Sequence, residues 1–538
     1  MIPDFKINKR QLLKLTLAAL VTPFMRMNNL VAKDLDETPT LQTDARLGIN
    51  LASIKDWNTE LPFVDMFKMS RTWVSQQKGK DWGAGPKLDL DENGWVKRLE
   101  ENCFANTIIC SDSKGHYPSG NYTVFYDGEG ELSFDGEYNS FKVVKSLPGK
   151  IILKVNQKKG MFIVNIIKTN PNNYLRNIRV IIPGSESEYL NNPWNPSFLK
   201  RWAGVACLRM MDFMVTNDSK QISWSNRPKP EDASYAIKGV PVEMLVDLAN
   251  RLNSEIWFCM PHQAEDDYVK HFARYVKENL NVKLRAWIEY SNEAWNGIFS
   301  QNEYMGIQGK LLKLDENVWE AGWKYYSLRS VQIFKIWEDI FEGTKRIVRV
   351  LSSQAANSYV SEVIVKYNNA FKNTDVLAIA PYVTLIVQPK NEHGITEEVV
   401  SGWNKSQLFD YINKISLPNS IQWIESNKKI TDKYHLNIVC YEAGQHLIGV
   451  FGSENNDKVT NLFLEANESP QMGEIYSQFL NAWTSRGGDL ICVFNSVSSW
   501  SKWGSWGLLQ YYDDNPNGSP KYLAVIKWAI SRGQKMSI

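Results

Sequence analysis

Eight short apolar runs recur along the chain, and most of them are separated by helical patterns. This alternation limits the available folds more than any other feature, because it indicates parallel strands joined by right-handed crossovers. Eight strand–helix units close into an α/β protein of the (β/α)8, or TIM, barrel type. The expected barrel strands are residues 47–51, 206–213, 255–261, 283–293, 346–352, 375–382, 437–442 and 489–495.

The connection between the first two expected strands is far longer than a usual loop. It contains several β-rich runs separated by Asp-Gly, Pro-Gly and Lys-Gly turns. We therefore expect a β-sandwich-like insertion over residues 115–185. The barrel is then formed by residues 44–114 and 186–538.

The first 33 residues predict an export signal, because a basic head precedes a short apolar stretch at 12–21. The basic head resembles a twin-arginine signal in which Lys9 replaces the first arginine. An ordinary secretory signal or an uncleaved anchor remains open. The chain is expected to be periplasmic or extracellular, with no integral membrane span after the signal is removed.

Composition excludes several partner classes. The 61 basic and 59 acidic residues give a net charge of +2, so nothing indicates a nucleic acid or an anionic membrane as partner. The six cysteines and six histidines show neither C-x-x-C nor H-E-x-x-H spacing, so no metal or other cofactor is expected. The 20 Trp and 23 Tyr suit stacking on sugar rings, although large α/β cores also use Trp. A monomer is expected.

Two carboxylates stand at the ends of expected strands. Glu293 ends the fourth strand in Tyr-Ser-Asn-Glu, and Glu442 ends the seventh in Val-Cys-Tyr-Glu. Barrel enzymes build their active sites at the carboxyl ends of the strands. Glycoside hydrolysis needs one carboxylic acid to protonate the leaving oxygen and a second carboxylate to attack the sugar or activate water.

These motifs resemble clan A of the retaining glycoside hydrolases, which are (β/α)8 barrels. The resemblance implies that Glu293 is the acid/base, Glu442 the nucleophile, and Asn292 the residue that binds the sugar 2-hydroxyl. It also places Arg209, from the second strand, beneath the nucleophile, where it would keep Glu442 ionised. Neutralising a buried acid such as Glu289 is the alternative role for Arg209.

The resemblance extends to two further positions and fails at two others. His262 ends the third strand, where the clan often has a substrate-binding histidine, and Tyr382 matches a tyrosine that donates to the nucleophile. The clan often has histidine at the position of Ala380, and tryptophan where Phe494 ends the eighth strand.

Four more residues are candidates for substrate contact, each with a packing role as the alternative. Gln445 and His446 closely follow Glu442. Trp500 and Trp503 lie with Trp506 in a loop of small residues after the eighth strand, which suits rings displayed at a cleft or packed on the barrel rim.

The sequence therefore predicts a retaining glycoside hydrolase that cleaves a β-linked poly- or oligosaccharide. A non-catalytic carbohydrate-binding protein of the cell envelope, on a glycosidase-like barrel, is the first alternative. The others are a different barrel enzyme, such as a lyase or a metal-dependent hydrolase, and an envelope interaction protein that works through the sandwich.

Overall fold

The computed structural model describes residues 45–136, 140–156, 160–390 and 395–537. The predicted export signal lies outside these residues. Within the described ranges, each helix is too short or too polar to cross a bilayer.

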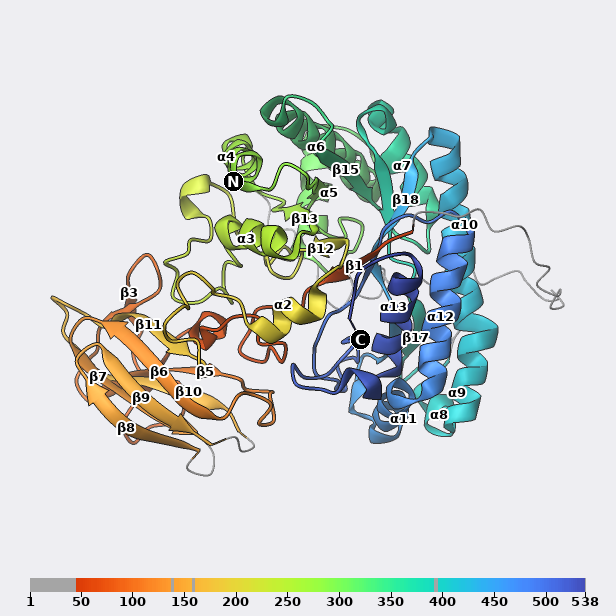
Figure 1. The fold of residues 1–538 in the computed structure, drawn as a ribbon. Helices are drawn as coiled ribbons and strands as arrows, with labels where there is room; N and C mark the ends of the chain where they lie inside the picture. The colour runs from red at the N-terminus through yellow and green to blue at the C-terminus, as the bar shows by residue number, and fades with distance from the viewer. Residues whose placement is uncertain (1–44, 137–139, 157–159, 391–394, 538) are drawn as a thin grey trace.

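Eight parallel strands close into a barrel, as the sequence predicts (Figure 1). Closure is set by β1, which pairs in parallel with both β12 and β20. The barrel strands in spatial order are β1 (Leu47–Asn50), β12 (Cys207–Arg209), β13 (Glu255–Met260), β14 (Ala286–Tyr290), β15 (Ile347–Ser352), β16 (Val376–Ile379), β18 (Asn437–Ala443) and β20 (Ile491–Val493). All eight lie within or next to the expected runs, but β12 is much shorter, because the chain turns at Met210, whose N–H still bonds to Trp257 of β13.

Helices surround the barrel and follow most of its strands. Their apolar faces pack on the outer side of the strands, and residues such as Leu245 and Phe272 are buried there. The helices are α2 (Pro196–Trp202), α3 (Val242–Leu252), α4 (Asp266–Asn279), α5 (Ser300–Leu311), α6 (Val318–Phe341), α7 (Ser358–Lys366), α8 (Glu397–Ser401), α9 (Lys405–Tyr411), α10 (Leu417–Tyr434), α11 (Asp457–Glu468), α12 (Pro470–Ser485) and α13 (Pro520–Ser531).

The barrel interior is a packed core rather than a pore. Trp257 and Trp287 stack with ring centroids 5.3 Å apart, and small cysteines fill the space beside them. At the end opposite the mouth, Glu255 accepts hydrogen bonds from Arg46, Arg285 and Trp287. All six cysteines are buried, and none forms a disulfide in the described residues.

Two antiparallel sheets lie between β1 and β12 in the sequence and pack against each other. One has the order β2-β5-β10-β7 and the other β11-β6-β9-β8, and Phe162 of β10 stacks on Phe141 of β8 at 4.4 Å. Their strands are β2 (Val74–Gln77), β5 (Cys103–Ile109), β6 (Gly120–Asp127), β7 (Gly130–Gly136), β8 (Phe141–Leu147), β9 (Lys150–Val155), β10 (Phe162–Thr169) and β11 (Arg176–Ile181), with a small β3 (Asp89–Leu90) and β4 (Val96–Arg98) hairpin. The sheets thus begin at residue 74, earlier than the 115–185 range expected from sequence. They include β2 and β5, whose runs the turn pattern did not mark.

The inserted sheets reach the barrel mouth through the loop between β5 and β6. Ser111 donates its N–H to the carbonyl of Asp56, which follows β1. His116 stacks on Tyr511, from the segment after β20, with ring centroids 3.9 Å apart. The insertion is therefore fixed to the two loops that leave adjacent barrel strands, although most of it lies apart from the barrel in Figure 1.

Candidate active site

The two candidate carboxylates lie at the same end of the barrel. Glu293 follows β14, the fourth strand, and Glu442 is the sixth residue of β18, the seventh strand. Both strands are parallel, so their carboxyl ends share one rim. The fourth and seventh strands lie on opposite sides of the barrel, so the two side chains approach its mouth from facing walls.

Backbone strain marks the end of β14. Ser291 has φ +64° and Glu293 has φ +40°, left-handed conformations that side chains other than glycine rarely adopt. The N–H of Ser291 still bonds to Met260 of β13 at 2.7 Å, and the N–H of Asn296 bonds back to Glu293 at 2.8 Å. The tight turn brings both Asn292 and Glu293 to the mouth, and such strain concentrates at functional sites.

Arg209 connects the candidate nucleophile to the residues around it. Its side chain is fully buried and donates to Glu442 at 2.8 Å and to Glu289 at 2.9 Å. It also donates to Asn292 at 2.7 Å and to Asn50 at 3.1 Å. The two roles considered for Arg209 therefore coincide: it contacts the mouth carboxylate and also neutralises Glu289, which lies deeper in the barrel.

Glu442 receives one charged and one neutral donor. Besides Arg209, the hydroxyl of Tyr382 donates to its second oxygen at 3.0 Å. Burial raises the pKa of Glu442, and the charge of Glu293 adds to this, whereas Arg209 and Tyr382 lower it. Each carboxylate oxygen thus has a fixed donor, which orients the group for attack from one direction.

Glu293 receives only neutral donors. Tyr441 donates to one oxygen at 3.1 Å, and the amide of Asn296 donates to the other at 2.8 Å. Burial raises the pKa of this carboxyl, and the donors from Asn296 and Tyr441 act against the rise. The Arg209 guanidinium lies on Glu442 and not on Glu293, so when the two carboxyls share one proton it favours the negative charge on Glu442.

Tyr441 was not predicted from the sequence. In a regular strand Tyr441 and Glu442 would point to opposite faces. The pairing of β18 with β20 shifts register between Cys440 and Ala443, and this irregularity lets both side chains reach the barrel interior. The indole of Trp295 then donates to the Tyr441 hydroxyl at 3.3 Å, so that hydroxyl donates onward to Glu293.

His262 lies just after the end of β13, near the barrel mouth. It is 2% exposed, its Nε2 accepts from Gln263 at 3.1 Å, and its Nδ1 is buried without a hydrogen-bond partner. Burial lowers its pKa to about 4, and Lys220 lowers it further, so the imidazole is neutral at neutral pH.

Gln445 and His446 occupy different surroundings. Gln445 is 1% exposed, and its amide bonds to the carbonyl of Ser505 and to the N–H of Leu447, so both its polar atoms are used within the protein. His446 lies with its ring centroid 5.5 Å from Tyr382 and 5.9 Å from Trp506. Burial lowers the pKa of His446 to about 4.

The three loop tryptophans separate into three environments. Trp500 is buried, donates to the carbonyl of Gly507 and lies under the Lys521 ammonium at 4.1 Å, so it holds the loop in place. Trp503 is 61% exposed. Trp506 is partly buried and packs edge-on against Phe494, the residue that ends the eighth strand. The loop after β20 thus brings a tryptophan ring next to Phe494 and His446.

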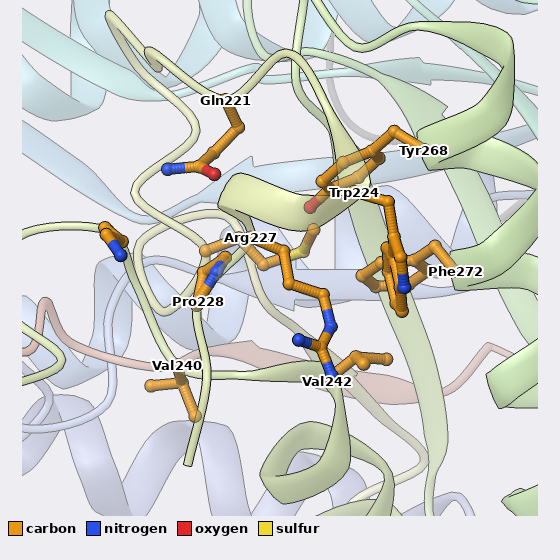
Figure 2. Close-up of a pocket in the computed structure, with 10 residues that line it drawn as sticks. Gln221, Trp224, Arg227, Pro228, Val240, Val242, Tyr268 and Phe272 are labelled. Atoms are coloured by element: carbon orange, nitrogen blue, oxygen red, sulfur yellow. The ribbon is translucent and has the colours of Figure 1, made fainter. Parts of the chain in front are cut away.

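A separate cavity lies between the loop after β12 and helices α3 and α4. Figure 2 shows Arg227 extending past Pro228 toward Val242, with Trp224 and Phe272 on the other side. Arg227 lies over the Trp224 ring at 4.4 Å and pairs with Glu243. None of the predicted site residues lines this cavity, so its charged groups serve the loop rather than the carboxylate pair.

One group in the described residues has the donor types of a metal site. His116 Nδ1 lies 2.7 Å from Asp513, with Asp514 nearby. Asp514 already accepts the N–H groups of Gln510 and Tyr511, so the cluster works as a contact between loops.

No protein-family model matches the chain, and no curated protein matches it in sequence. Several solved structures are similar in outline. A 4-O-α-L-rhamnosyl-β-D-glucuronidase from Fusarium oxysporum is 12% identical over 64% of this chain and 66% of its own, with a TM-score of 0.39. An endo-β-1,4-mannanase double mutant from Cellulomonas fimi is 10% identical over 60% and 62%, with a TM-score of 0.34.

A family 5 lichenase from Caldicellulosiruptor is 12% identical over 62% of this chain and 84% of its own, with a TM-score of 0.35. The chain thus spans less than two thirds of the first two structures. The similar structures are glycoside hydrolases, and no family within that class is identified. At such distance the likeness does not extend to activity.

Proposed function

We propose that the chain is a retaining glycoside hydrolase acting on a β-linked poly- or oligosaccharide. The observation that carries this is the unequal donor set of the two mouth carboxyls. Glu442 is held by the Arg209 guanidinium and the Tyr382 hydroxyl, whereas Glu293 has only Tyr441 and Asn296. One site thus provides a charged carboxylate and a protonated carboxylic acid, the two groups that the reaction requires.

In the first step Glu442 attacks the anomeric carbon and the glycosidic bond breaks. The proton of Glu293 passes to the leaving oxygen, and a covalent glycosyl-enzyme remains on Glu442. In the second step Glu293, now ionised, takes a proton from water, and that water displaces Glu442 from the sugar. The sugar hydroxyl groups are bound by Asn292 and His262, and the ring is faced by Trp506.

The fixed orientation of Glu442 supports retention rather than inversion. A carboxylate that activates water must leave room for that water, whereas a nucleophile must be aimed at the sugar. Arg209 and Tyr382 engage both oxygens of Glu442 from the side of the barrel core. The group is thereby positioned as a nucleophile.

The test is hydrolysis of a panel of β-linked glycans, with the product anomer followed by NMR. The wild-type chain should release reducing ends with retained configuration. Glu442→Ala should lose activity by several orders of magnitude, and azide should restore turnover with inverted glycosyl azide as product. Glu278→Ala, on the exposed side of α4, is the matched control and should retain activity.

Two outcomes would contradict the proposal. Glycan binding by the wild-type chain with no bond cleavage on any substrate would favour the non-catalytic carbohydrate-binding protein. Unchanged turnover in Glu442→Ala would remove this residue from the mechanism. Export and a monomeric state remain part of the proposal, to be measured by cell fractionation and by light scattering.

A further inference from the structure

The inserted sheet β11-β6-β9-β8 has an inner face on the other sheet and an outer face turned away from it. On β9, Ile151, Leu153 and Val155 are buried, and Lys150 and Lys154 alternate with them. Successive residues of a strand point to opposite faces. The two lysines therefore lie on the outer face.

Strand register brings more cations to the same face. Lys154 pairs directly with Lys142 of β8, and Lys145 pairs with Ile152 between the two β9 lysines. Lys150 pairs with Phe125 of β6, and its ammonium lies 5.3 Å from the centroid of that ring. We call Lys142, Lys145, Lys150 and Lys154 the lysine face.

The lysine face is short of counter-charges among the residues that the structure describes. Across the residues that the structure describes, no carboxylate forms an ion pair with any of its four members. The nearby Arg179 of β11 does have one, Asp127 at 3.7 Å. Lys142, Lys145 and Lys154 are exposed. For a chain whose net charge is only +2, this is an uneven concentration of positive charge.

Protection of a sheet edge explains only part of this arrangement. Lysines on an edge strand discourage pairing with other chains, which accounts for Lys142 and Lys145 on β8. Edge protection does not account for Lys150 and Lys154, because β9 is an inner strand that pairs with β6 on one edge and β8 on the other. Moreover, Lys154 and Lys142 lie directly opposite each other, and like charges in that position destabilise a sheet. An anion bound between them would remove that cost.

We propose that the lysine face binds an anionic polysaccharide that carries carboxylate or sulfate groups. The polymer class rests on the proposed function of the barrel, whereas the requirement for negative charge rests on the lysine face alone. The Cα atoms of Lys150 and Lys154 lie about 13 Å apart along β9, and those of Lys142 and Lys154 lie about 5 Å apart across the strands. This spacing suits repeated charges on an extended polymer. Stacked bases are less suitable, because the nearest ring, Phe125, is covered by Tyr189 at 5.4 Å.

Binding would hold the barrel near its substrate. A second site on the same chain turns a later encounter into an intramolecular one and raises the effective concentration of glycan at the mouth. The insertion is fixed to the mouth loops through His116 and Ser111, so a bound polymer stays within reach of the carboxylates.

The test measures equilibrium binding of the full chain to polygalacturonate, dextran sulfate and uncharged dextran. The lysine-face variant combines Lys142→Gln, Lys145→Gln, Lys150→Gln and Lys154→Gln. Four exposed lysines on barrel helices and loops provide a control with the same charge change: Lys335→Gln, Lys345→Gln, Lys429→Gln and Lys527→Gln. Single exposed charges contribute little, so all four are changed together.

We expect the wild-type chain to bind at least one anionic polymer and not to bind uncharged dextran. The binding should weaken as the salt concentration rises. The Kd of the lysine-face variant should rise at least about 10-fold, and that of the control less than about 3-fold. Thermal unfolding checks that both variants remain folded.

Equal loss in both variants, or no wild-type binding to either anionic polymer, would overturn the proposal. So would tighter binding to a single-stranded DNA or to phosphatidylglycerol vesicles than to both polysaccharides. Because binding needs no bond cleavage, an inactive barrel leaves this test unaffected, and hydrolysis of uncharged glycans, which do not need the lysine face, tests the barrel separately.

Discussion

Replacing Arg209 by methionine tests whether its charge sets the ionisation of Glu442, the proposed nucleophile. Arg209 donates to Glu442 and Glu289, and no other positive charge in the described residues forms an ion pair with these two carboxylates. Opposite charges about 4 Å apart interact by about 4 kcal/mol at an effective dielectric constant near 20. That energy corresponds to a change of about 3 in the pKa of Glu442.

Burial already raises the pKa of Glu442, and losing Arg209 raises it further. The ionised fraction at pH 7 should then fall by up to about 10³, and kcat/KM should fall with it. The measurement is kcat/KM against pH for wild type, Arg209→Met and Arg209→Lys. The acid limb should move to higher pH in Arg209→Met, and Arg209→Lys should move it less, since a charge remains.

Arg349→Met is the matched control. Arg349 bridges Glu338 and Asp375 on the outer side of the barrel, both at 2.7 Å. Breaking a partly buried pair of this kind should cost about 3 kcal/mol or more of stability in either variant, but only Arg209→Met should change the pH profile. A uniform fall in kcat/KM at every pH, with the acid limb unmoved, would refute the electrostatic reasoning and leave Arg209 a merely structural residue.

Three further outcomes are expected. Folding raises the pKa of both mouth carboxyls, so the folded state binds an extra proton and the pair lowers stability as pH rises above the ordinary carboxyl pKa. Glu442→Gln should therefore unfold at a higher temperature than wild type at pH 8, with a smaller gain at pH 5, as followed by calorimetry; no gain at either pH would contradict this. Tyr441→Phe removes a donor that lowers the pKa of Glu293, so the basic limb of kcat/KM should move to higher pH, and a shift to lower pH would count against it. Trp506→Ala should raise KM about 10-fold or more through lost ring contact while the pH profile stays fixed; Trp503→Ala is its control, and an equal effect of both would show that Trp506 has no special place.

Much of the site was visible in the sequence. Glu293 and Glu442 end apolar runs whose length and spacing predict barrel strands, and closure of the barrel confirms those strands. A strand end has a defined place on a closed barrel, so local pattern is enough to bring these residues to one rim. The predicted placement of Arg209 beneath Glu442 agrees with their 2.8 Å contact.

Other parts of the site depend on contacts that no local pattern encodes. Glu442 reaches the barrel interior beside Tyr441 because β18 loses register against β20. Trp506 reaches His446 because the loop after β20 folds back over Lys521. The early strand β5 joins the inserted sheet by pairing with β10, more than 50 residues later. Trp500 and Trp503 have similar neighbours in the sequence, yet Trp500 is buried and Trp503 is exposed.

The sequence by itself determined the barrel, its eight strands and the two acids at its mouth, because period, run length and turn residues act on neighbouring residues. The tertiary structure alone decided which acid lies against the guanidinium and which has only neutral donors. It placed Arg209, 233 residues from Glu442 in sequence, on that carboxyl, placed the Tyr441 hydroxyl on Glu293, and removed water from both carboxyls. Each of these comes into being only when distant segments are packed together, since the electrostatic energy of a carboxyl depends on its surroundings in space and not on its neighbours along the chain.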